Sequence, residues 1–249
     1  MPARPAVPVP QRPHEDRTVP LDPALPPLLR EHLDPTGTGR VPLVETFALW
    51  ARGRMRLGGG ISLPLRFTAM HRVGEGFLHD LAITWFGLPV IPGADLFVDG
   101  RGVMRVGPKE WSGPEMDQGA NLAMWGEALI APSVFAAGSP LRAVQEDDAT
   151  VRLTMPLGGG TDTAWLSFEY GRPVRFRALR HRGPGGTKEW WHGQTRDWQD
   201  VEGGVVAPRY LAATWEADGR PWLELDVQGV TLHADVDTRF AEHGRRGSR

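Results

Sequence analysis

Short segments of alternating apolar and polar residues, separated by glycine-rich turns, constrain the fold of this 249-residue chain most strongly. In residues 46–57, for example, Phe47 and Leu49 point to one side while Trp50 and Arg52 point to the other. A period of two predicts half-buried β-strands. Strands that follow one another through tight turns form antiparallel sheets, since parallel strands need long crossovers. About eleven strands in a row must also curl. The sequence therefore predicts a mainly β fold, a single strongly curved antiparallel sheet or half-barrel.

One segment, from Ser112 to Pro132, instead has helical spacing. Its apolar residues recur three and four positions apart, as at Leu122, Trp125 and Leu129. Asp117 is a suitable N-cap, and Ser112 with Glu115 offers an alternative capping box one turn earlier. Pro132 cannot continue the helix and is expected to close it. We therefore expect one interior helix over 116–130, on the concave side of the sheet.

The two ends of the chain differ in composition from its middle. Residues 1–20 are proline-rich and are predicted to be a disordered arm, with no continuous apolar stretch typical of a signal peptide. A short helix is expected over 22–33, capped by Asp22. Residues 21–239 are predicted to form a single β-rich domain, and the charged residues 240–249 a flexible tail.

Charge and composition exclude several classes of protein. The formal net charge is −2, which argues against nucleic-acid binding, and no apolar run is long enough to span a bilayer. The chain has no cysteine, which excludes disulfides and thiolate chemistry and favours a cytoplasmic location. Ten tryptophans stand against two tyrosines, more tryptophan than a core needs. No feature indicates the oligomeric state.

The order of several short motifs resembles an uncharacterised bacterial family, one of the domains of unknown function, from about residue 25 to 230. The motifs are a Asp-Gly-Arg-Gly hairpin within 95–104, the helical segment from Ser112 to Pro132, and later segments at 179–182, 190–193 and 206–208. Phe97 stands where the family is expected to have tyrosine. The resemblance implies no catalytic residue. The layout is similar to the helix-plugged half-barrels of bacterial lipoprotein carriers, an analogy of fold.

Familiar catalytic and cofactor motifs do not emerge from the sequence. The triple glycines at 58–60 and 158–160 lack the lysine of a phosphate-binding loop and are expected to be turns. No Gly-x-Ser-x-Gly elbow occurs. Histidines could gather a metal only if separate strands converged, because no His-x-x-x-His or His-Glu-x-x-His pair is present; the candidates are His79, His181, His192 and His233. The sequence thus predicts no cofactor and no metal.

Two charged residues are expected on the inner side of the fold. Strand alternation places Arg180 on the same face as Phe176 and Ala178, and Glu127 lies at the flank of the helix stripe. A buried arginine is costly unless a carboxylate pairs with it. We expect Arg180 to pair with Glu127, unless Arg180 lies near enough to the strand end to reach water.

Two functions remain open on this reading. The first is non-catalytic binding of a hydrophobic or amphipathic, lipid-like ligand in a tryptophan-lined concave pocket. The second is a hydrolase-like enzyme of unrecognised type, using Glu127, Arg180 and a nearby histidine, His181 or His192, in the same cleft. The lack of a catalytic signature favours the first. The expected ligand-binding residues are Trp50, Trp85, Met124, Trp125, Glu127, Trp165, Arg180, Trp191 and Trp215.

Overall fold

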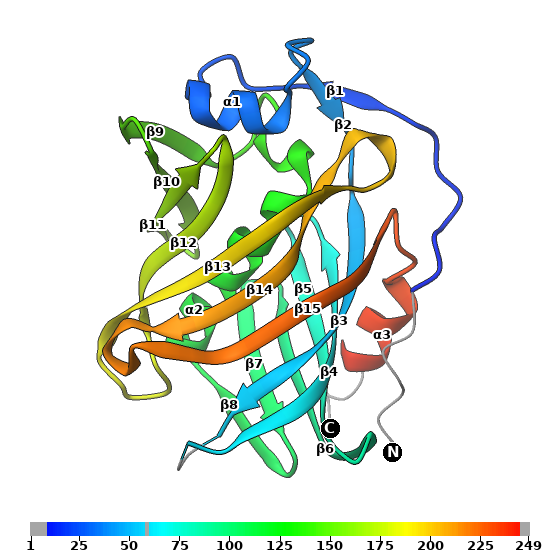
Figure 1. Cartoon of the computed structure of the whole chain (residues 1–249), viewed down its shortest axis with the longest axis vertical. Helices are drawn as coiled ribbons and strands as arrows, with labels where there is room; N and C mark the ends of the chain where they lie inside the picture. The colour runs from blue at the N-terminus through cyan, green and yellow to red at the C-terminus, as the bar shows by residue number, and fades with distance from the viewer. Residues whose placement is uncertain (1–8, 58–59, 245–249) are drawn as a thin grey trace.

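The computed structural model describes residues 9–57 and 60–244, in which thirteen strands form one antiparallel sheet (Figure 1). The first six are β3 (Thr46–Arg56), β4 (Ser62–Arg72), β5 (Gly76–Trp85), β6 (Leu88–Val98), β7 (Arg101–Val106) and β8 (Lys109–Ser112). The other seven are β9 (Arg142–Asp147), β10 (Thr150–Leu157), β11 (Gly160–Glu169), β12 (Arg172–His181), β13 (Lys188–Asp200), β14 (Val206–Trp215) and β15 (Arg220–Leu232). The predicted class of fold is confirmed, with two strands more than expected.

The strands form two meanders joined at their outer members. The spatial order is β8-β7-β6-β5-β4-β3-β15-β14-β13-β12-β11-β10-β9, so β3 pairs with β15 in the middle of the sheet. The predicted hairpin at Asp99-Gly100 joins β6 to β7, and both residues have positive φ, at 52° and 74°. Positive φ at both central residues is typical of the turn that matches strand twist.

The connection between β8 and β9 explains why the sheet curls. These strands are its two edges, which would lie roughly 55–60 Å apart if thirteen strands were flat. They are linked through α2 (Pro114–Glu127), which is about 21 Å long, followed by short 3₁₀ segments at 128–130 and 132–135. α2 contacts β6, β7 and β8 from one half and β10, β11 and β12 from the other. The sheet therefore wraps around this helix, which lies between the two halves in Figure 1.

The predicted interior helix is confirmed, but its start differs from the expectation. Neither predicted cap forms: the N-cap is Gly113, with no side-chain cap bond, and Pro114 is the first helical residue. Asp117 accepts a hydrogen bond from the backbone N–H of Gly102 in β7 instead, at 2.6 Å. The carboxylate thus ties the helix to the sheet. Because the sheet surrounds α2, its buried residues lie on several faces rather than one stripe.

Apolar residues fill both faces of the sheet. On the concave side, Leu122 and Trp125 of α2 pack among Phe176, Leu153 and other strand residues. On the convex side a smaller cluster is covered by Phe240 of α3 (Asp237–Gly244). Helix α3 starts before the predicted tail and runs through 244, so this part of the tail is corrected to a packed helix; residues 245–249 lie outside the described residues.

The N-terminal segment also packs against the domain. Residues 1–8 of the predicted arm lie outside the described residues, but β1 (Thr18–Pro20) pairs with β2 (Arg40–Pro42), and Gln11 forms a bridge with Ala234. This stretch of the arm is therefore corrected to paired backbone. The predicted short helix is α1 (Pro27–Leu33); Asp22 does not cap it but closes a turn by accepting from the N–H of Ala24. Figure 1 shows α1 and β1–β2 over one end of the curled sheet.

Candidate functional site

Two histidines on neighbouring strands point into the concave interior. His71 ends the inward-facing series of β4 that includes Phe67 and Ala69, and His79 has the same orientation in β5. In the register, His71 lies opposite Phe77 and His79 opposite Ala69, which makes the two histidines diagonal neighbours. Their ring centroids are 6.0 Å apart. The β4–β5 hairpin thus brings together two residues that are eight positions apart in the sequence.

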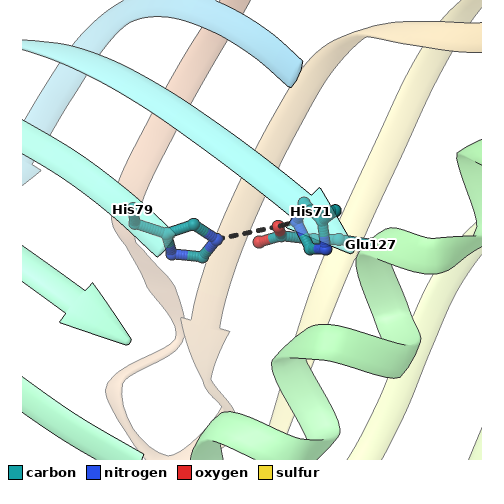
Figure 2. Close-up of side chains that lie close together, drawn as sticks. All are labelled: His71, His79 and Glu127. Carbon is teal, nitrogen blue, oxygen red and sulfur yellow. Dashed lines mark hydrogen bonds and ion pairs between the residues drawn. The ribbon is translucent and has the colours of Figure 1, made fainter. Parts of the chain in front are cut away.

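Glu127, the last residue of α2, completes this cluster (Figure 2). One carboxylate oxygen, Oε2, lies 2.6 Å from Nε2 of His71 and 2.9 Å from Nε2 of His79. The two imidazoles donate to the same oxygen from different strands. The side chains of His71 and His79 are 1% and 7% exposed, whereas that of Glu127 is 24% exposed. Glu127 is therefore the most exposed side chain of the cluster.

The shared carboxylate raises the pKa values of both rings, but burial opposes it and the two net shifts have opposite directions. Burial lowers the pKa of His71, and the bond and charge of Glu127 offset this only in part. Burial acts the same way on His79, but the charge and hydrogen bond of Glu127, together with the charges of Asp95 and Asp80, outweigh it and raise the pKa. Burial would raise the pKa of Glu127, yet the two histidines hold it far below its usual range. Of the two rings, His79 therefore takes up a proton more readily than His71.

Asp95 and Arg180 extend the polar cluster along the concave face. Asp95 of β6 lies opposite His79 in the register. Burial raises the pKa of Asp95, and the charges of His79 and Arg180 oppose that rise. Arg180 of β12 lies against α2 at Gly119, where an added Cβ would come 2.5 Å from its Nη2. Burial lowers the pKa of Arg180 to about 10, so the guanidinium remains charged at neutral pH.

The expected ion pair between Glu127 and Arg180 is not the arrangement in the structure. Both residues face the interior, but Glu127 bonds to His71 and His79, and the acidic group whose charge acts on Arg180 is Asp95. The physical reason is position along the helix, since Arg180 packs beside Gly119 and Glu127 lies two turns further on. Among the residues that the structure describes, no hydrogen bond or ion pair links the two.

The predicted ligand-binding tryptophans divide between interior and exterior. Met124, Trp125, Trp191 and Trp215 pack in the interior core. The other three lie elsewhere: Trp50 packs on Gly229, Trp85 is 59% exposed at the end of β5, and Trp165 stacks edge-on with Trp190 and donates to Glu146. The guanidinium of Arg180 lies 5.0 Å from the ring centroid of Trp191 and 5.7 Å from that of Trp215. The structure thus places two of the aromatic rings beside Arg180.

The other histidine candidates lie apart from the cluster. His181 bonds to the carbonyl of Gly186, His192 lies beside Glu216, and His233 stacks on His14. The predicted turn at 158–160 joins β10 to β11; the one at 58–60 lies partly outside the described residues. Sequence reasoning included His79 but missed His71. The signal was available in the alternation Phe67, Ala69, His71, which assigns that ring to the inner face.

This geometry allows two kinds of chemistry. The donor atoms of His71, His79 and Glu127 lie within 4.8 Å of one another, so the three can hold a proton or a metal ion. No acceptor in the described part of the chain bonds to the guanidinium of Arg180, which suits an anionic group. A nucleophile is not part of either arrangement.

Comparison with known sequences decides the family. A family model described as "Family of unknown function (DUF6544)" matches residues 20–225. The chain belongs to this family. The match confirms the expected resemblance to a domain of unknown function, and DUF6544 has no activity attached to its description. A comparison with curated proteins gave no match.

Several solved structures are similar in shape to this DUF6544 chain. A LolA superfamily protein from Nitrosomonas europaea has a TM-score of 0.45 and 12% identity, covering 82% of this chain and 91% of that one. A putative outer membrane lipoprotein-sorting protein domain from Vibrio parahaemolyticus has a TM-score of 0.43 and 10% identity, covering 76% of this chain and 86% of that one. A DUF1329 family protein from Desulfovibrio piger has a TM-score of 0.43 and 10% identity, covering 84% of this chain and 91% of that one.

The expected cytoplasmic location is corrected. It was based on the lack of cysteine, which excludes disulfides but does not specify a compartment. The similar structure from Vibrio parahaemolyticus is described as a putative outer membrane lipoprotein-sorting protein domain, and the cytoplasmic prediction is not kept. Within residues 9–57 and 60–244, no helix is long and apolar enough to cross a membrane.

Proposed function

We propose that this protein binds an amphipathic ligand with an anionic head group on the concave side of its sheet, without covalent chemistry. The observation that carries the proposal is the burial and hydrogen bonding of Arg180. Its side chain is half-buried against α2, and among the described residues no acceptor bonds to its guanidinium. A buried donor without a partner costs about 1–3 kcal/mol, and more when charged. A carboxylate or phosphate on the ligand would satisfy it.

The surroundings of Arg180 support an amphipathic rather than a simple ionic ligand. Trp191 and Trp215 flank the guanidinium, and the buried Nε1–H of Trp191 also has no acceptor among the described residues. Asp95 contributes a charge but no hydrogen bond, and burial raises its pKa, which weakens it as a counter-ion. A head group that accepts from both Arg180 and Trp191 fits these free donors.

An apolar surface lies on the same face. Leu81 and Leu223 share the inward orientation of the core residues of β5 and β15, yet both are only half-buried. The same holds for Met55 of β3, which lies opposite Leu223, and for Met104 of β7, opposite Asp95. Helix α2 therefore covers only part of the concave face. The half-buried apolar residues offer a surface to the ligand tail.

Binding of a fluorescent fatty-acid analogue to the full chain tests this function. Arg180→Met should weaken saturable binding about 10- to 100-fold, because it removes a charge-assisted hydrogen bond worth about 1.5–3 kcal/mol. Arg175→Met is the matched control: this arginine lies on the opposite face of the same strand and is exposed, so its affinity should equal that of the wild type. Equal affinity in both variants, or no saturable binding at all, would contradict the proposal.

Extraction of the purified protein separates binding from catalysis. Organic extraction and mass spectrometry should yield an anionic lipid-like compound. The enzymatic alternative is kept because Glu127 lies within hydrogen-bonding distance of two histidines. The histidines of this site are His71 and His79, whereas the sequence predicted His181 or His192, which lie elsewhere. A protein that extracts clean and turns over a panel of esters or glycosides, with loss of turnover in Glu127→Gln, would favour the enzyme.

A further inference from the structure

The donor atoms of His71, His79 and Glu127 converge on one point in the interior. Among the described residues, this cluster is the group of histidine and acidic side chains whose donor atoms converge closely enough for one ion. We propose that these three residues form a binding site for a divalent metal ion of the zinc type. This goes beyond ligand binding at Arg180, because it needs neither Arg180 nor an organic ligand.

The distances are close to those of a metal site. Zinc binds histidine nitrogen at about 2.0–2.1 Å and carboxylate oxygen at about 2.0–2.2 Å, so two tetrahedral ligands lie about 3.3 Å apart. The corresponding separations here are 2.6 Å from Glu127 to His71 and 2.9 Å from Glu127 to His79. Each contact must open by less than about 1 Å. The side chain of Glu127, at 24% exposure, has more room to adjust than the two rings.

The two imidazoles are held rigidly toward a common point. The ring of His71 stacks on Phe47 with centroids 4.4 Å apart and an interplanar angle of 7°. The ring of His79 stacks on Phe77 at 4.2 Å. Adjacent strands fix both backbones. Ligands fixed before binding lose little conformational entropy when a metal binds, which favours affinity.

The donor set indicates the class of metal. Two imidazole nitrogens and one carboxylate oxygen suit zinc and neighbouring transition metals, whereas magnesium and calcium prefer oxygen ligands. Three protein ligands leave a fourth coordination position, as in zinc sites that hold water or a further ligand. Glu127, as the partly exposed member, gives an ion a way in from solvent.

Titration of the chelator-treated full chain with Co²⁺ tests this site, because cobalt reports its coordination by visible absorption. The wild type should bind one equivalent with the intense bands of four-coordinate cobalt, and Zn²⁺ should displace it. Glu127→Gln and His79→Gln should each weaken binding at least about tenfold. His181→Gln, at a half-buried histidine outside the cluster, should bind like the wild type.

Two results would overturn the metal site. One is the lack of saturable metal uptake by the wild type, and the other is uptake that persists unchanged in Glu127→Gln and His79→Gln. Circular dichroism shows whether each variant folds. If both fail to fold, X-ray absorption of the wild-type cobalt complex decides the matter: two imidazole ligands per ion support the proposal, and fewer than two overturn it.

Discussion

At the scale of single residues, two histidines that bond to the same carboxylate have opposite pKa shifts, because their other surroundings differ. His71 is enclosed by aromatic rings and has a lowered pKa, whereas His79 also feels Asp95 and Asp80 and has a raised one. The pKa of Glu127 lies well below its usual range. The charge of His79 lowers the pKa of Glu127 more than any other neighbouring group does.

These shifts predict how the contribution of Glu127 to stability depends on pH. The depressed pKa of Glu127 contributes stability above its ordinary value of 4.5, and this is lost as pH falls toward the folded value. The raised pKa of His79 contributes below 6.5, and this is lost as pH rises through the folded value. Glu127→Gln should therefore lower the free energy of unfolding most, by about 3 kcal/mol, between the two ordinary pKa values of 4.5 and 6.5.

Urea unfolding of the wild type and of Glu127→Gln, at pH values across and beyond this range, measures the difference in stability. Glu146→Gln is the control, because Glu146 pairs with Arg152 near the surface and should cost less than about 1 kcal/mol at any pH. A cost of Glu127→Gln that is the same at every pH would show that the carboxylate and His79 are not electrostatically coupled.

At the scale of secondary-structure elements, the position of α2 depends on close approach to the sheet. Gly102 of β7 packs directly on the backbone of the helix, where an added Cβ would overlap the carbonyl oxygen of Met116. On the opposite side, the Cα of Gly126 faces the ring of Phe176, and Gly119 faces Arg180. Small residues on both sides let two halves of the sheet close on one helix.

Gly102→Ala should therefore move α2 away from β7. Backbone atoms cannot rotate aside as a flexible side chain does, so overpacking here should destabilise the fold by about 1–3 kcal/mol. The bond from Gly102 to Asp117 would lengthen with it. Chemical denaturation measures the loss, and Gly183→Ala is the control, since a Cβ there meets nothing within 4 Å. Equal stability of the two variants would rule out the tight contact.

At the scale of the whole molecule, the sheet is covered on both faces by chain from outside the meanders. The interior is filled by α2, and the N-terminal residues Leu25 and Leu29 close one end of it. The convex face is covered near β4–β6 by α3, where Phe240 packs with Met70 and Leu78. The C-terminal helix is thus part of the packed domain rather than a free tail.

Phe240→Ala tests whether α3 contributes to the global stability. Phe240 is 8% exposed and its ring lies under the guanidinium of Arg72 at 4.5 Å. Removal of a large buried ring should cost about 2–4 kcal/mol in thermal or urea unfolding. Phe86→Ala is the matched control, because Phe86 is 93% exposed and should change stability by no more than about 0.5 kcal/mol. Equal effects would mean that α3 is not docked in solution.

The sequence by itself determined the class of fold and the inward orientation of several site residues. Alternation at Phe47 and Leu49 and the Asp99-Gly100 turn are local signals, since a strand has a period of two and this turn requires positive φ. The same alternation assigned Arg180 to the inner face, where it lies. Local patterns of this kind do not depend on how the sheet closes.

Only the tertiary structure decided which residues meet. Glu127 follows the two histidines by 56 and 48 positions, and its choice of His71 and His79 over Arg180 depends on where the curled sheet holds the end of α2. Asp117, a good helix cap by its local sequence, bonds to Gly102 because β7 comes close enough to compete. Contacts between distant segments depend on sheet curvature, which arises from all thirteen strands together, so no local pattern specifies them.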